Sequence, residues 1–238
     1  MRCSDIGRVH SIQTLGTLDG PGVRFVVFLQ GCNLRCSCCH NPDTWSVEGG
    51  REMSATELAE RAVRYKEYFG HDGGVTVSGG EPLLQAEFTR AFFAECKKRG
   101  INTCLDTSGS IIGEQTKALL DVTDRVLLDI KYPSGELYRE HVGCSFENPL
   151  AFLDLLAERG IPTTLRQVII PTLTDNEESV RYLVELKGSH PCVDKIELLP
   201  FRKICQVKYD KLGISFKFAH LPEPSHEKLA KLQALIKE

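Results

Sequence analysis

The stretch Gln30-Gly31-Cys32-Asn33-Leu34-Arg35-Cys36-Ser37-Cys38-Cys39-His40-Asn41-Pro42 places four of the chain's ten cysteines within eight consecutive positions. Three of them, Cys32, Cys36 and Cys39, follow a Cys-x3-Cys-x2-Cys spacing and supply three thiolates from one short loop. A closed iron–sulfur or structural zinc site takes one ligand more. The loop therefore predicts a metal centre with an open coordination position.

Three thiolates suit either a [4Fe–4S] cluster or zinc, and Cys39-His40 even offers a Cys3His zinc set. Structural zinc sites usually draw ligand pairs from two separated segments, whereas here the ligands crowd one loop. Adjacent Cys and His side chains also converge poorly on one ion. We therefore favour the cluster, whose open iron can take an amine and a carboxylate, and keep a zinc-stabilised binding module without catalysis as the alternative.

Length and composition narrow the class of protein. The 238 residues fit one α/β domain, so we expect a single domain over 1–238. The 29 Lys and Arg against 32 Asp and Glu give no reason to expect nucleic acid or a membrane as partner. With no apolar run of secretory or membrane-spanning type, we expect a cytoplasmic protein. In that reducing compartment the other six cysteines, Cys3, Cys96, Cys104, Cys144, Cys192 and Cys205, are expected to be thiols in the core or bystanders.

Apolar runs alternate with helical patterns along the chain. Strands are expected over 7–13, 23–29, 73–78, 101–105, 126–130, 163–170 and 193–199, and helices over 54–69, 85–99, 114–121, 149–159, 176–187 and 224–237. Six strand–helix units in series predict a parallel sheet with right-handed crossovers, either an open barrel or a doubly wound sheet. A closed eight-unit barrel is two units short.

Polar residues and the cysteines follow the carboxyl ends of these strands. The cysteines follow the strand over 23–29, Gly79-Gly80-Glu81 the next, Asp106 the third, and Asp129 and Lys131 the fourth. Carboxyl ends of parallel strands share one rim, where such folds bind their ligands. The glycine pair lets a ligand approach the backbone, Glu81 can accept from an ammonium group, Asp129 from ribose hydroxyls, and Lys131 can bind a carboxylate.

Cys-x3-Cys-x2-Cys followed by Gly79-Gly80-Glu81-Pro82 resembles the radical S-adenosylmethionine enzymes. The resemblance extends along nearly the whole chain to those members that activate glycyl-radical enzymes. Its motifs are Asp19-Gly20-Pro21-Gly22-Val23-Arg24, Gln30-Gly31-Cys32, Cys39-His40-Asn41, Asp43-Thr44-Trp45, Cys104-Leu105-Asp106-Thr107 and Lys195-Ile196-Glu197-Leu198-Leu199-Pro200. Other activases often insert a ferredoxin-like segment after the first motif. The residues between Cys39 and Gly79 contain no cysteine, which is typical of the short form.

The resemblance implies a partial (β/α)6 TIM-type barrel that holds a [4Fe–4S] cluster, with S-adenosylmethionine on the open iron. Cys32, Cys36 and Cys39 are the implied cluster ligands and, with Lys131, the catalytic residues. The implied S-adenosylmethionine contacts are Cys38, His40, Gly79, Gly80, Glu81, Asp129, Ile130, Lys131, Arg166 and Arg202. The implied monovalent-cation site consists of Asp106, Thr107, Leu127 and Asp129. Asp19 and His40 match positions that face the substrate peptide.

Two positions depart from the family pattern. Cys38 stands where an aromatic residue commonly lies against the adenine, and we interpret it as a nucleotide-side contact rather than a ligand. Arg202 stands where His is common, and an arginine can stack on a purine face.

The resemblance also implies partners. A backbone glycine of a glycyl-radical enzyme is the expected target, flavodoxin or ferredoxin the expected electron donor, and an anaerobic setting the expected context. Activation of a different glycyl-radical enzyme, or a small-molecule radical reaction, stays open as an alternative.

Overall fold

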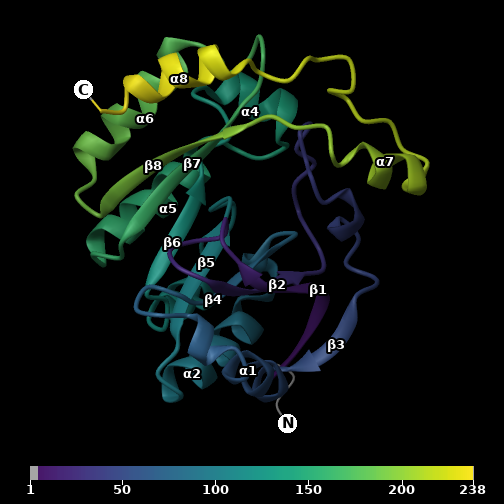
Figure 1. The fold of residues 1–238 in the computed structure, drawn as a ribbon, viewed down its shortest axis with the longest axis vertical. Coiled ribbons are helices and arrows are strands. Elements are labelled where there is room, and N and C mark those ends of the chain that lie inside the picture. The colour runs from purple at the N-terminus through teal and green to yellow at the C-terminus, as the bar shows by residue number, and fades with distance from the viewer. Residues whose placement is uncertain (1–4, 238) are drawn as a thin grey trace. The chain divides into compact units, whose positions relative to one another are not determined.

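The computed structural model describes residues 5–237, so Cys3 lies outside the described part. Eight strands form one sheet in the order β3-β1-β2-β4-β5-β6-β7-β8 (Figure 1). The strands are β1 (Ile6–Gly16), β2 (Arg24–Leu29), β3 (Arg51–Ser54), β4 (Gly74–Gly79), β5 (Asn102–Thr107), β6 (Arg125–Asp129), β7 (Thr163–Ile169) and β8 (Val193–Pro200). β3 and β8 are the two edges, so the sheet is not closed.

Parallel pairing dominates the sheet. β2 pairs in parallel with β4, β4 with β5, and β7 with β8, whereas β1 runs antiparallel to both β2 and β3. The predicted α/β fold with parallel strands is confirmed. The short edge strand β3 was not predicted, because two of its four residues are charged and only Met53 is buried.

The chain forms two compact units. The N-terminal unit comprises residues up to 33, 44–107 and 111–127, and the C-terminal unit comprises 34–43, 108–110 and the residues from 128 onward. The expectation of a single domain over 1–238 stays a prediction.

In the N-terminal unit, α2 (Ala86–Lys98) packs against both α1 (Ala55–Val63) and α3 (Glu114–Leu120). Its phenylalanines Phe88, Phe92 and Phe93 are buried, as their helical spacing predicts. The helix expected over 54–69 is shorter. Ser54 caps α1 by accepting from the backbone N–H of Glu57, but the α-helix ends at Val63 and a separate 3-10 turn follows over Lys66–Tyr68.

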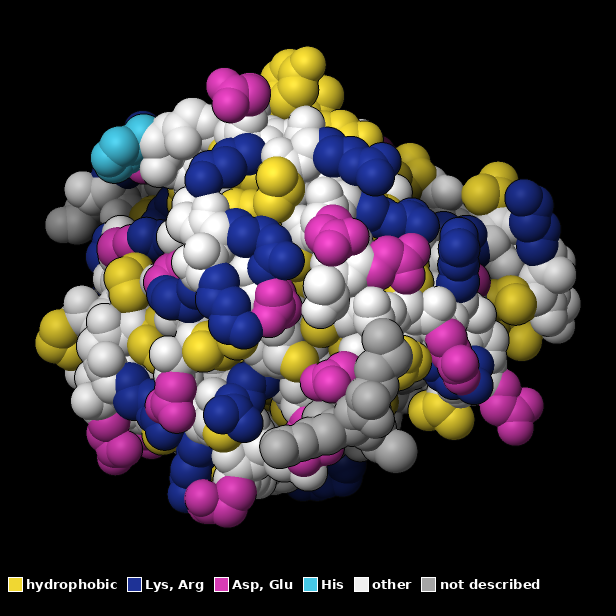
Figure 2. Space-filling model, turned by 90° about the horizontal axis from the view of Figure 1, so that it is seen from below, with side chains coloured by type: hydrophobic (Ala, Val, Ile, Leu, Met, Phe, Trp, Pro, Cys, Tyr) yellow, Lys and Arg dark blue, Asp and Glu magenta, His cyan; other side chains and the backbone are white. Residues whose placement is uncertain are grey.

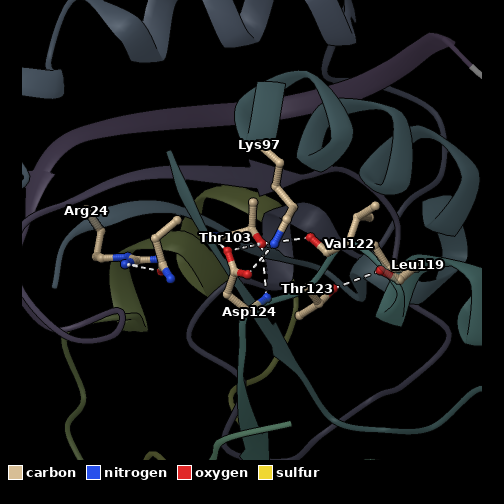
Figure 3. A network of polar contacts seen from close by, with 8 residues as sticks. Arg24, Lys97, Thr103, Leu119, Val122, Thr123 and Asp124 are labelled. Carbon is tan, nitrogen blue, oxygen red and sulfur yellow. Dashed lines mark hydrogen bonds and ion pairs between the residues drawn. The ribbon is translucent and has the colours of Figure 1, made fainter. Parts of the chain in front are cut away.

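A polar network fixes the turn between α3 and β6 to the beginning of β5 (Figure 3). The Thr103 backbone N–H donates to Asp124 Oδ2 at 2.9 Å, and the Thr103 hydroxyl donates to the Val122 carbonyl at 2.8 Å. Lys97 of α2 pairs with the same Asp124 carboxylate. These contacts satisfy buried polar groups at the amino ends of the strands.

The helices of the C-terminal unit are α4 (Gly135–His141), α5 (Glu147–Glu158), α6 (Glu177–Ser189), α7 (Gln206–Leu212) and α8 (His226–Ala234). α6 and α8 both contact β8. The helices predicted over 149–159, 176–187 and 224–237 are present with shifted ends. α4 and α7 were not predicted, because each buries a single residue, Tyr138 or Tyr209, and therefore shows no amphipathic pattern.

All nine described cysteines are free thiols, and Cys96, Cys104 and Cys205 are buried as core residues. On the face drawn in Figure 2, Lys and Arg side chains alternate with Asp and Glu, with single apolar side chains between them. Within residues 5–237, no helix combines the length and the apolar character that crossing a membrane requires.

Candidate functional site

The cysteine loop of the C-terminal unit is held by hydrogen bonds to α4. The backbone N–H of Arg35 donates to the Val142 carbonyl at 3.0 Å, and that of Ser37 donates to the His141 carbonyl at 2.8 Å. The backbone N–H of Cys39 closes a turn onto the Cys36 carbonyl at 3.1 Å. The end of α4 therefore fixes the backbone on both sides of Cys36.

α7 holds the other side of the loop. The Tyr209 hydroxyl donates to the Cys39 carbonyl at 3.1 Å. Lys208 Nζ donates to Asn41 Oδ1 at 2.8 Å and to Asp43 Oδ1 at 3.1 Å. The backbone N–H of Asn41 in turn donates to Cys39 Sγ at 3.3 Å, a bond that stabilises the thiolate form of a ligand.

Burial separates the cysteines of the loop. Cys36 and Cys39 are half-buried, whereas Cys38 is buried with 8% of its surface exposed. Burial raises the pKa of Cys38 to about 11, although the nearby Lys131 acts in the opposite direction. The surroundings of Cys38 therefore favour its protonated form.

Asp129, at the end of β6, lies between two cations. Lys131 Nζ pairs with Asp129 Oδ2, and Arg166 Nε of β7 lies 3.5 Å from Asp129 Oδ1. Burial by itself would raise the pKa of Asp129, but the charges of Lys131 and Arg166 outweigh burial and lower it. The three side chains carry one negative and two positive charges, so a ligand carboxylate would balance the group.

Asp129, Lys131 and Arg166 form a charged triad, and hydrogen bonds and charges also fix the residues around it. Burial would lower the pKa of Lys131, yet the charge of Asp129 and of the Cys36 and Cys38 thiolates raises it. The Lys131 backbone N–H donates to the Tyr138 hydroxyl at 2.9 Å, and the Ile130 backbone N–H donates to the Arg166 carbonyl at 2.9 Å. Lys131 is therefore a fixed cation within electrostatic reach of the cysteine loop.

Tyr132 was missed by sequence reasoning, which had no signal for it. Its side chain is 1% exposed, and none of the described residues hydrogen-bonds its hydroxyl. Burial, followed by the negative charge of Cys38 and Cys36, raises its pKa. Because an unpaired buried hydroxyl is costly, this atom fits a site completed by a bound group.

His40 is fixed by the backbone of Arg202, not by its side chain. A His40 ring N–H donates from Nε2 to the Arg202 carbonyl at 3.0 Å, and burial lowers the pKa of His40. The Arg202 guanidinium pairs instead with Glu223 at 2.5 Å. The predicted stacking of Arg202 on adenine would require this exposed pair to rearrange or share the guanidinium.

In the N-terminal unit, the Gly79-Gly80 pair lets the chain pack against itself. Gly79 has φ 116°, and a Cβ on Gly80 would lie 2.0 Å from the Gly31 carbonyl oxygen. The backbone N–H groups of Gly80 and Glu81 donate to the Leu29 and Gly31 carbonyls, each at 2.9 Å. The pair thus fixes the segment that leads into Cys32, while its predicted ligand contact stays a prediction.

Two carboxylates lie at the carboxyl ends of β4 and β5. Glu81 is 2% exposed, and its Oε1 accepts from the Thr107 hydroxyl at 2.5 Å and from the Leu83 backbone N–H at 3.1 Å. Ser78 donates to Asp106 Oδ2 at 2.7 Å. The structure therefore brings Glu81, Asp106 and Thr107 to the same strand ends, as the sequence predicts.

The turn that carries Asp19 rests on Arg24, a second residue that sequence reasoning did not assign. Arg24 is fully buried and donates to Thr76 Oγ1 at 3.0 Å. Thr76 donates in turn to the Asp19 carbonyl at 2.7 Å. Arg24 also donates to the Asp72 and Val75 carbonyls at 3.1 and 2.5 Å.

The remaining predicted position is Leu127, whose role in the implied cation site stays a prediction. Leu127 is a buried β6 residue with 1% of its surface exposed. Within residues 5–237, no three His, Cys, Asp or Glu side chains converge on a point that would bind a single metal ion. A cubane cluster needs no such convergence, because each of its irons takes one protein ligand.

Known proteins resemble this chain in sequence and in fold. Residues 26–183 match the model of the radical SAM superfamily, and this chain belongs to that superfamily.

The match to individual proteins is closer. The chain is 44% identical, over 98% of both chains, to the pyruvate formate-lyase-activating enzyme of Clostridium pasteurianum. It is 40% identical to the pyruvate formate-lyase 1-activating enzyme of Escherichia coli K12, over 99% of this chain and 97% of that protein. The chain thus belongs to the family of pyruvate formate-lyase-activating enzymes.

Solved structures share the fold. A domain of a pyruvate formate-lyase-activating enzyme from Bacteroides vulgatus superposes with a TM-score of 0.58 at 23% identity, over 69% of this chain and 93% of that one. Streptococcus suis SuiB bound to S-adenosylmethionine superposes with a TM-score of 0.64 at 17% identity, over 87% of this chain and 44% of that one.

Proposed function

We propose that this protein activates pyruvate formate-lyase by generating a radical on a backbone glycine of that enzyme. The observation that carries the proposal is the 40–44% identity to activating enzymes over nearly the full length of both chains. Activation of a different glycyl-radical enzyme is the alternative, because the sequence holds no direct signature of the partner.

Family membership implies a [4Fe–4S] cluster and S-adenosylmethionine as cofactors. Together they supply, after one-electron reduction, a 5′-deoxyadenosyl radical and methionine. We assign the cluster to Cys32, Cys36 and Cys39. The burial of Cys38 and its raised pKa support its assignment as a thiol beside the nucleotide and not as a ligand.

The charged triad supports the assignment of the amino acid end of S-adenosylmethionine. Lys131 and Arg166 would bind its carboxylate, and Asp129 would hold Lys131 in place while offering an acceptor to the ribose. Glu81 would accept from its ammonium group. Gly79, Gly80 and Ile130 would complete the binding segment through their backbones, and Arg202 would contact the adenine.

The remaining assignments concern the partners. Asp19 and His40 would face the substrate peptide, and burial lowers the pKa of His40, which favours its neutral form. Asp106, Thr107, Leu127 and Asp129 would hold a monovalent cation. Cluster potentials reach about −700 mV, and sulfonium cleavage needs the low end of the range, which supports flavodoxin or ferredoxin as donor. A cytoplasmic, anaerobic setting is part of the proposal.

The test is anaerobic reconstitution with iron and sulfide, followed by reduction, addition of S-adenosylmethionine and mixing with pyruvate formate-lyase. We expect cleavage to methionine and 5′-deoxyadenosine and a glycyl doublet in the electron paramagnetic resonance spectrum. Cys36→Ala should lose the cluster, whereas the matched Cys38→Ala variant of the same loop should keep it.

Three outcomes would contradict the proposal. A reduced, iron-loaded protein that leaves S-adenosylmethionine intact, together with a cluster retained in Cys36→Ala, excludes the radical assignment. Cleavage without a glycyl doublet on pyruvate formate-lyase favours another partner. About one zinc per chain without acid-labile sulfide would favour the zinc-stabilised binding module.

A further inference from the structure

Tyr132 is a buried polar side chain of the C-terminal unit that the proposed function leaves unused. Its hydroxyl is enclosed, and within the described part of the chain it has no hydrogen-bond partner. The neighbouring Tyr138 differs, because its hydroxyl accepts from the Lys131 backbone N–H at 2.9 Å. Leaving a buried hydroxyl unpaired is costly, so its presence needs a reason.

His141 connects Tyr132 to the cysteine loop. Its ring packs on that of His141, with centroids 5.4 Å apart. The His141 carbonyl accepts from the backbone N–H of Ser37, which lies between Cys36 and Cys38. The two cysteines are also the groups whose negative charge, after burial, most raises the pKa of Tyr132.

We propose that the Tyr132 hydroxyl donates a hydrogen bond to the iron–sulfur cluster, at a cysteine thiolate or a bridging sulfide, and raises its reduction potential. This inference rests on the proposed function, because it requires the cluster. Reduction adds negative charge to the sulfurs, so a donor stabilises the reduced form more than the oxidised form. Tyr132 is then a residue that adjusts the potential at which the electron enters.

The test compares Tyr132→Phe, which removes one oxygen, with the matched control Tyr182→Phe. Tyr182 belongs to α6 of the same unit and packs on Phe146 with ring centroids 5.9 Å apart. Each reconstituted protein is titrated anaerobically without S-adenosylmethionine, and the reduced cluster is followed by electron paramagnetic resonance.

We expect Tyr132→Phe to lower the ratio of reduced to oxidised cluster about threefold at a fixed potential. For a one-electron couple, tenfold corresponds to 59 mV, so threefold is about 28 mV toward negative potential. Tyr182→Phe should leave the midpoint unchanged. Electron–nuclear double resonance in deuterated water should show an exchangeable proton coupled to the wild-type cluster that Tyr132→Phe lacks.

Two further outcomes separate the explanations. An intact cluster with an unmoved potential and no such exchangeable proton overturns this inference alone, even if S-adenosylmethionine binding weakens. A wild-type protein that forms no cluster overturns the proposed function and this inference with it. If Tyr132→Phe fails to fold, the proton signal of the wild-type cluster decides, because its absence overturns the assignment.

Discussion

Replacing Arg24 with Met should destabilise the protein strongly although Arg24 lies outside the cofactor assignments. Its guanidinium makes four hydrogen bonds, to Thr76 Oγ1, the Asp72 and Val75 carbonyls and Asn102 Oδ1. The acceptors on Thr76 and Val75 are buried, and leaving each unsatisfied costs about 1–3 kcal/mol, or about 2–6 kcal/mol together.

Two effects reduce this cost. Burial lowers the pKa of Arg24, because keeping the charge away from water costs free energy. Met carries no charge and therefore avoids this cost. Met also fills most of the space, and the partly exposed acceptors on Asp72 and Asn102 can bond to water. We therefore expect a net loss of about 3 kcal/mol in the free energy of unfolding.

The assay is urea unfolding of the metal-free, reduced protein, followed by circular dichroism. Arg61→Met is the matched control, because Arg61 makes an exposed helical pair with Glu57 worth only about 0.2–0.5 kcal/mol. A loss below about 1 kcal/mol for Arg24→Met would show that the hydrogen bonds of Arg24 contribute little to stability. Arg24 also supports Thr76, which holds the Asp19 carbonyl, so binding of a glycine-loop peptide should weaken along with stability.

Three further predictions concern the site and the core. Lys131→Met should weaken S-adenosylmethionine binding to the unreduced, cluster-loaded protein by about 10–150-fold, measured by calorimetry, because one charge-assisted hydrogen bond of about 1.5–3 kcal/mol is lost. Tyr209→Phe loses the hydrogen bond to the Cys39 carbonyl, so it should lower the free energy of unfolding by about 1 kcal/mol, measured by thermal unfolding. It should also speed the loss of the cluster to a chelator. Cys104, buried with its pKa raised to about 11, keeps its proton to higher pH than the unfolded thiol. Relative to Cys104→Ala, wild-type stability should be constant well below pH 9 and fall by about 2–3 kcal/mol as the pH rises through 11.

The sequence predicted the central strands well and the short elements poorly. Runs such as 23–29 and 73–78 are buried on both faces, and such strands read as continuous apolar stretches. β3 lacks that pattern because it is an exposed edge with one buried residue. α4 and α7 bury one residue each, so their packing against the cysteine loop, rather than local periodicity, defines them.

Site residues were predictable where chemistry shows in the residue type. Thiols, carboxylates and cations at strand ends can be picked out as candidates, and Asp129 and Lys131, expected at one strand end, do pair. Arg166 lies inside β7 and was named through the family resemblance alone; it also lies beside Asp129, while the ligand roles of all three stay predictions. Gly79 and Gly80 were harder, since glycine serves equally for ligand approach and for backbone packing, and the structure shows the packing directly. Nothing in the sequence marks Tyr132, because a tyrosine is as common in an ordinary core as beside a functional site.

Within the C-terminal unit, the short helix α4 connects two parts of the proposed cofactor site that are distant in sequence. Its Tyr138 hydroxyl accepts from the backbone N–H of Lys131, and the His141 carbonyl accepts from the backbone N–H of Ser37. One element therefore positions both Lys131, the proposed partner of the S-adenosylmethionine carboxylate, and the loop that carries Cys36 and Cys39. A displacement of α4 would move both at once, which ties the geometry of the sulfonium cleavage to a helix that contributes no ligand itself.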